Sequence, residues 1–167
     1  MLLISFLVSA CVHPPAQLAD GPFVDADPVR ARAPDACGQR VRWGGSIVSV
    51  EPRTSETCFE VVERPLDAVA RPRDTDESGG RFIACAPGFY DPVVYEKGRE
   101  ITVVGVVDAP ATGTIGEYEY QFARLKAERV YLWSKRSPYP PDVHVINPWG
   151  WTPYWGTFGR PYFPYWW

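Results

Sequence analysis

Between residues 41 and 133, apolar and polar residues alternate in short runs, which is the pattern of β-strands with one buried face. Five runs predict strands, and they cover residues 41–50, 58–64, 81–86, 100–107 and 120–133. Gly44-Gly45 interrupts the first run, which indicates either a bulge or a sharp coil. A helix over residues 123–132 competes with the fifth strand, because periodicity alone does not separate a short strand from a short helix.

The connections between these runs predict the order of the elements. Residues 67–80 are polar and predict a long loop, and the Gly-rich residues 108–117 predict another connection. Asp91-Pro92 is typical of a helix start and Lys97-Gly98 of a helix end, so we expect one or two helical turns between the third and fourth strands. Three strands, a short helix and two strands form the order of an OB-fold. We therefore predict a mainly β domain, a small five-stranded OB-like barrel, and such a fold does not by itself imply nucleic-acid binding.

The first ten residues have the apolar stretch and the small residues of a secretion signal, but they lack the usual positive start. We expect the true start to lie upstream and residues 1–10 to be the remnant of a signal peptide. Val8-Ser9-Ala10-Cys11 resembles the bacterial lipobox, which implies lipid attachment to Cys11, cleavage before it and acylation of the new amine. Several acyl chains give a stable membrane anchor. The alternative is an ordinary signal peptide with an incidental cysteine.

Residues 11–36 combine five prolines with many alanines and aspartates and show no periodicity. This composition predicts a lipid anchor followed by a stiffened tether that holds the domain away from the lipid surface. Residue 12 is Val and not Asp, and by resemblance to lipoprotein sorting this predicts transport to the outer membrane.

Residues 135–167 form a tail rich in Pro and aromatic residues, and this density of Pro disfavours both helix and central strand. The aromatic side chains could pack back onto the domain, lie at a membrane interface, stack on a cell-wall glycan or fill a partner's groove. The candidate contact residues are Trp149, Trp151, Trp155, Tyr162, Trp166 and Trp167.

Length and charge narrow the class of protein. The 167 residues suffice for one domain with a core, and after residue 10 no apolar run is long enough for a membrane-spanning helix. The net charge is −3, so we expect no basic face for a nucleic acid.

The cysteines predict one disulfide, because the compartment reached by export is oxidising. Cys58 and Cys85 are the predicted pair, since they lie on adjacent strands whose long connecting loop leaves the register free. Cys37 is then the odd thiol, free or intermolecular. A zinc site is disfavoured because the chain has no CxxC pair and because His13 and His144 both lie outside the predicted core.

The sequence offers few residues that could act in catalysis. A Ser–His–Asp or Cys–His site would have to recruit a histidine from outside the core. Glu60 and Glu63 are expected on opposite faces of one strand, where they cannot act as a pair. We predict no enzyme, no catalytic residues, no metal and no cofactor.

Several segments taken in order resemble the Slp family of outer-membrane lipoproteins, named for a starvation-inducible member. They are Val41-Arg42-Trp43-Gly44-Gly45, Glu63-Arg64-Pro65-Leu66-Asp67, Gly80-Arg81-Phe82, residues 87–92 and 98–105, Ile115-Gly116-Glu117-Tyr118 and Tyr131-Leu132-Trp133. The resemblance places a family-like β domain at residues 37–134. It implies a lipid-anchored envelope protein that faces the periplasm and is linked to starvation or stationary phase. The implied partners are the membrane and either the cell wall or another envelope protein. The alternative function is binding of a cell-wall oligosaccharide through the aromatic tail.

Overall fold

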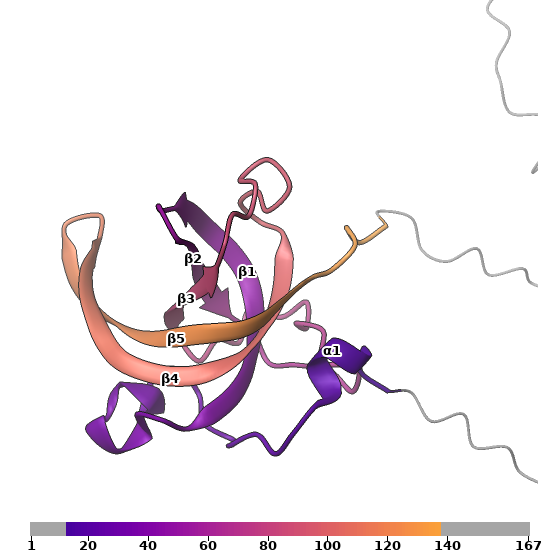
Figure 1. Ribbon diagram of the computed structural model, residues 1–167, viewed down its shortest axis with the longest axis horizontal. Coiled ribbons are helices and arrows are strands. Elements are labelled where there is room, and N and C mark those ends of the chain that lie inside the picture. Colours follow the sequence, from indigo (N-terminus) through magenta and orange to yellow (C-terminus); the bar gives the residue numbers. More distant parts are fainter. Residues whose placement is uncertain (1–12, 138–167) are drawn as a thin grey trace, which may run out of the picture. The chain divides into compact units, whose positions relative to one another are not determined.

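A computed structural model describes residues 13–137, and five strands dominate it (Figure 1). The helical elements are short: α1 spans Ala16–Ala19, and two 3₁₀ turns span Arg30–Arg32 and Pro34–Ala36. The strands are β1 (Arg40–Pro52), β2 (Glu56–Glu63), β3 (Arg81–Pro87), β4 (Glu100–Ile115) and β5 (Tyr118–Leu132).

The strands close into one barrel in the order β1-β2-β3-β5-β4. β1 is shared by both halves of the barrel, because its first part pairs with β4 and its second part with β2, both antiparallel. β3 pairs antiparallel with β2 and parallel with β5, and β4 and β5 form a hairpin. This is the arrangement of a five-stranded OB barrel, so the predicted fold class is confirmed.

The hydrophobic core consists of the side chains that point from each strand into the barrel. Alternation along the strands produces it, since buried positions recur at every second residue in the first part of β1 and in β3. The largest fully buried side chains inside the barrel are Phe59, Phe82, Ile47, Ile101, Leu125, Val41, Val61 and Val103. Trp43 packs edge-on against Phe82, with the ring centroids 5.2 Å apart.

Gly44 and Gly45 lie where β1 passes from β4 to β2. A Cβ atom on Gly45 would lie 1.9 Å from the carbonyl oxygen of Val62, so only glycine allows this close approach of the two backbones. The register of β1 against β2 shifts between Ile47 and Ser49, beyond the glycine pair. The predicted bulge therefore does not lie at the glycine pair itself, which marks the point where β1 pairs with both neighbouring strands.

The fourth and fifth strands are longer than the sequence pattern predicts. Residues 108–115, expected as a connection, continue β4, and the chain turns at Gly116 with φ +62°. The side chains of this outer part are mostly exposed or half-buried on both faces, which removes the apolar alternation that would have revealed a strand. The strand over residues 120–133 is confirmed, and its helical alternative is wrong.

The helix predicted between β3 and β4 is absent, and one turn stands in its place. The backbone N–H groups of Val94 and Tyr95 donate to Asp91 O (3.0 and 2.9 Å), and the Asp91 carboxylate accepts from the N–H of Val93 (2.8 Å). Asp91 thus caps the turn as predicted. The turn ends because Gly98 N–H donates to Ile47 O of β1, at 2.8 Å, which takes the next residues out of helical geometry.

Residues 14–36 pack on the barrel, so the predicted tether is wrong for this range. Leu18 of α1 is fully buried, and Ala31 and Ala36 belong to the main core. Val24 N–H donates to Arg40 O (2.9 Å), and the indole N–H of Trp43 donates to Ala26 O (2.6 Å). Small alanines and backbone hydrogen bonds make these contacts, which is why no apolar periodicity announces them.

No helix within residues 13–137 has the length and the apolar character needed to cross a membrane.

Candidate functional site

The structure brings Cys58 and Cys85 together. They are direct cross-strand neighbours on β2 and β3, and their sulfur atoms form a disulfide with an S–S distance of 2.07 Å. Cys37 is free and exposed. The lipid-attachment candidate Cys11 and the six candidate aromatic residues of the tail lie outside residues 13–137.

Removing the disulfide is expected to lower the free energy of unfolding by about 2–4 kcal/mol, because the cross-link restricts the unfolded chain. The loop it closes is sizeable, with a sequence separation of 27 residues. The test is urea unfolding of the double variant Cys58→Ala/Cys85→Ala against Cys37→Ala, whose exposed thiol makes it the matched control. Equal stability of the two variants would contradict the expectation.

The described residues contain one cluster of potential metal ligands, formed by Glu56, Cys58 and Cys85 with ligand atoms within 4.8 Å of one another. Both sulfur atoms of this cluster are engaged in the disulfide, so neither is available as a thiolate ligand.

Glu60 and Glu63 are not brought together. The Glu60 carboxylate accepts hydrogen bonds from Arg81 (2.7 Å) and Ser49 (3.2 Å), whereas the Glu63 carboxylate accepts from the backbone N–H of Gly79. Their separate partners agree with the prediction that they face opposite sides of β2 and do not form a carboxylate pair.

A groove of about 530 Å³ lies between the N-terminal segment 23–27 and the β1–β2 side of the barrel. Its other lining residues are Arg42, Trp43, Glu63, Pro65 and Leu66. The Arg42 guanidinium lies over the ring of Phe23, 4.8 Å from its centroid, and donates to Leu18 O at 2.9 Å. Sequence reasoning missed this groove because one of its walls is the segment expected as a tether. The Phe23 side chain within that segment is the one signal that could have indicated packing.

Burial raises the pKa of Glu63 in this groove, and the nearby Asp27 carboxylate raises it further. The Gly79 N–H and the Arg64 guanidinium act in the opposite direction without cancelling these effects. The folded protein therefore holds the Glu63 proton more tightly than the unfolded chain does.

Glu63→Gln is expected to raise the stability near pH 7 and to change little at about pH 3.5, where the carboxyl is neutral in both states. The sign follows from linkage: the native state binds more protons between the ordinary pKa and the raised one, so the wild type loses stability as pH rises through that window. Urea unfolding at both pH values measures the effect. Glu60→Gln is the control, because it weakens the ion pair with Arg81 and should not stabilise the protein. A Glu63→Gln variant that is less stable near pH 7 would contradict the expectation.

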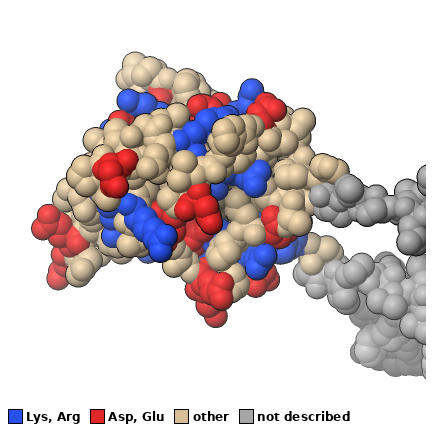
Figure 2. Space-filling view, turned by 90° about the horizontal axis from the view of Figure 1, so that it is seen from below, with Lys and Arg blue, Asp and Glu red and all other residues tan. Residues whose placement is uncertain are grey.

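Charges of both signs are interspersed over the face shown in Figure 2. The described strands also carry ion pairs, such as Arg40 with Glu128 (3.0 Å) and Lys126 with Asp108 (3.3 Å). A nucleic-acid backbone is recognised by clustered cations, and this face has no continuous basic surface of that kind.

The strand order and the short, packed N-terminal segment define the class: a small OB-like barrel with an extended β4–β5 hairpin. The chain belongs to the outer membrane lipoprotein Slp family, whose model matches residues 8–166. The family prediction and the outer-membrane localisation are thereby confirmed.

Curated relatives agree with this assignment. The chain is 33% identical to the uncharacterized lipoprotein YeaY of Escherichia coli K12 over 95% of its length and 81% of the relative. It is 26% identical to the outer membrane protein Slp of the same organism over 98% of its length and 89% of the relative. An uncharacterized protein of Haemophilus influenzae is 28% identical, over 93% of the chain and 84% of the relative.

Solved structures are similar at a lower level. A small single-stranded DNA-binding protein from Streptomyces coelicolor is 13% identical, with a TM-score of 0.37 over 57% of this chain and 94% of that one. The mitochondrial single-stranded DNA-binding protein Rim1 of S. cerevisiae is 12% identical, with a TM-score of 0.37 over 60% of this chain and 99% of that one. Likeness at this score says nothing about function, and the fold assignment rests on the strand order above.

Proposed function

We propose that the protein is anchored in the outer membrane by lipid on Cys11 and that its barrel is a non-catalytic periplasmic domain serving envelope maintenance in starvation or stationary phase. The family match is the observation on which this rests. It begins at residue 8, so the lipobox-like Val8-Ser9-Ala10-Cys11 stands at the start of the matched range.

The contacts of the barrel support a structural role. Within residues 13–137 the one imidazole belongs to the exposed His13, which precedes α1. The acidic side chains that sequence analysis considered for catalysis instead accept hydrogen bonds from Arg81 and Gly79. The wall-glycan alternative rests on the composition of the tail, because its six aromatic residues lie outside the described range.

The anchor is tested by expression with labelled palmitate in a Gram-negative host behind a complete lipoprotein leader, followed by separation of the two membranes. Wild type is expected to have the label in the outer membrane, and Cys11→Ala is expected to have none. Cys37→Ala is the matched control, because it removes an exposed thiol of the described domain and should keep the label. Label in Cys11→Ala, or none in wild type, would contradict the proposal.

A further inference from the structure

The segment between β3 and β4 carries three of the six exposed large apolar side chains of the described residues. Phe89 is 73% exposed, Val93 81% and Val94 48%. Exposed apolar side chains that gather in one place mark an interaction surface. We call these three residues the apolar tip.

The other side of the same segment is firmly packed. Tyr90 and Tyr95 lie on Phe59, each with a centroid distance of 5.4 Å, and on each other at 5.2 Å. Tyr90 N–H also donates to Thr57 Oγ1 at 3.1 Å. We call Phe59, Tyr90 and Tyr95 the aromatic base. Because this base holds the tip outward, presenting the tip to a partner needs little further ordering.

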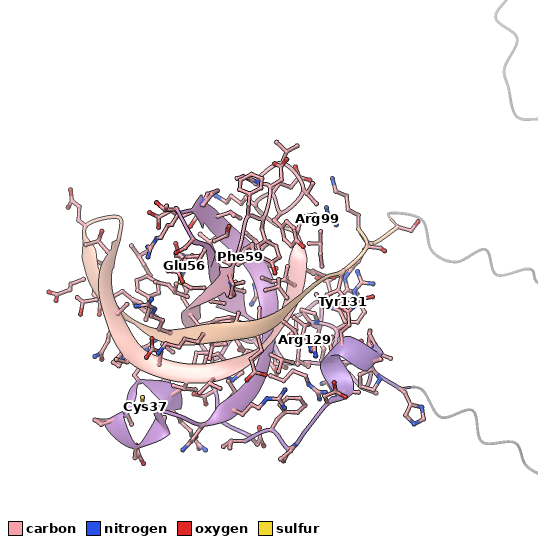
Figure 3. All side chains as sticks on the ribbon, viewed as in Figure 1. Cys37, Glu56, Phe59, Arg99, Arg129 and Tyr131 are labelled. Carbon is pink, nitrogen blue, oxygen red and sulfur yellow. A yellow bond between two sulfur atoms is a disulfide. The ribbon has the colours of Figure 1, made fainter. Side chains whose placement is uncertain are left out.

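Contacts connect the apolar tip to both ends of the described domain. Arg99 donates to Val94 O and to Trp133 O, at 3.0 Å each, and Lys135 pairs with Glu96 at 2.7 Å. Trp133 packs in the same cluster as Leu18 of α1. Figure 3 shows Arg99 and Tyr131 along the side of the barrel that leads from this segment to α1.

The N-terminal segment leaves little chain between Cys11 and the domain. Pro15 is half-buried and precedes α1, whose Leu18 is fully buried. The four residues from Cys11 to Pro15 span at most about 14 Å when fully extended. A lipid on Cys11 would thus hold the domain against the bilayer surface and not away from it.

We propose that the apolar tip docks on the lipid surface that receives the Cys11 anchor, with Phe89, Val93 and Val94 inserted among the headgroups. This inference rests on the proposed function, because the short reach from Cys11 keeps the domain close to the bilayer. Charge favours a phospholipid partner. Lys97 and Arg99 follow the tip, whereas the Glu96 carboxylate is paired with Lys135 and the Asp91 carboxylate accepts a hydrogen bond from Val93 N–H. Cations beside an inserted apolar loop suit anionic headgroups.

The test places a nitroxide on the full-length acylated protein in vesicles of phosphatidylethanolamine and phosphatidylglycerol. In a Cys37→Ser background the label is attached at Val93→Cys or, as control, at Glu117→Cys. Glu117 lies at the tip of the β4–β5 hairpin, on the opposite side of the barrel from α1 (Figure 1). Power saturation then compares collisions with oxygen, which partitions into lipid, and with a water-soluble nickel chelate.

The ratio of oxygen to nickel collisions is expected to be several-fold higher at residue 93 than at residue 117. Equal ratios in acylated protein would overturn the docking and leave the anchor standing. Low collision rates with both reagents at residue 93 would indicate a protein contact, either a second copy or another partner, and would also overturn it. Mass spectrometry before reconstitution separates the two proposals, since protein without an acyl group would refute the anchor and the docking with it.

Discussion

Phe59→Ala is expected to lower the free energy of unfolding by about 3–5 kcal/mol, the range for losing a large aromatic side chain from a packed core. Phe59 is fully buried on β2 and supports the rings of Tyr90 and Tyr95. Its truncation leaves a cavity under these two rings, which the β-barrel backbone cannot close by local collapse. Urea unfolding followed by circular dichroism measures the loss.

Phe89→Ala is the matched control, because it removes the same side chain from a position that is 73% exposed. Its effect on stability should stay within about 0.5 kcal/mol, as for most surface substitutions. A Phe59→Ala variant as stable as Phe89→Ala would show that the aromatic base does not contribute to the core. The pair also separates stability from docking, since only Phe89 belongs to the apolar tip.

The strands that could be predicted are those with one face in the core and the other in water. β2 and β3 were predicted in this way, and their order as consecutive strands of one hairpin led to the pairing of Cys58 with Cys85. The outer part of the β4–β5 hairpin does not follow it. No side chain of β4 beyond Val107 is buried, and this part of the strand is held by backbone pairing, such as Thr112 with Gln121. Backbone pairing of this kind leaves no trace in hydropathy.

The helix predicted between β3 and β4 does not form, for a different reason. Asp91-Pro92 supplies a start and Gly98 a stop, but these signals are local, and a nucleus of one turn is unfavourable without further hydrogen bonds. Ile47 of β1 competes for the backbone of the same segment, through bonds with Gly98 and Arg99. A contact between residues about fifty positions apart decides the outcome.

Tertiary contacts of the N-terminal segment also change the expected distance between the domain and the membrane. Its composition predicts a spacer, but Leu18, Ala31 and Ala36 are buried against the barrel. The groove beside Trp43 exists only because residues 23–27 lie along β1, so no motif could have indicated it. The same packing shortens the free reach of the anchor, which changes the expected position of the domain from distant to close to the membrane.

Gly45→Ala is expected to prevent stable folding, with a loss of more than about 4 kcal/mol, which is exceptional for one methyl group. The added Cβ would lie 1.9 Å from Val62 O, 2.8 Å from Val62 C and 3.0 Å from the Cα of Glu63, and backbone atoms cannot rotate away. Gly45 pairs with Glu63 of β2 and with Ile101 of β4, so it lies where β1 joins the two halves of the barrel. Relief would require β1 and β2 to separate, which opens the barrel.

Gly113→Ala is the matched control, because its Cβ would meet only the ring of Phe122, at 3.1 Å, on the β4–β5 hairpin. Urea unfolding and limited proteolysis compare the two variants. If Gly45→Ala came within about 1 kcal/mol of Gly113→Ala, the close approach of β1 and β2 would not be a requirement of this fold.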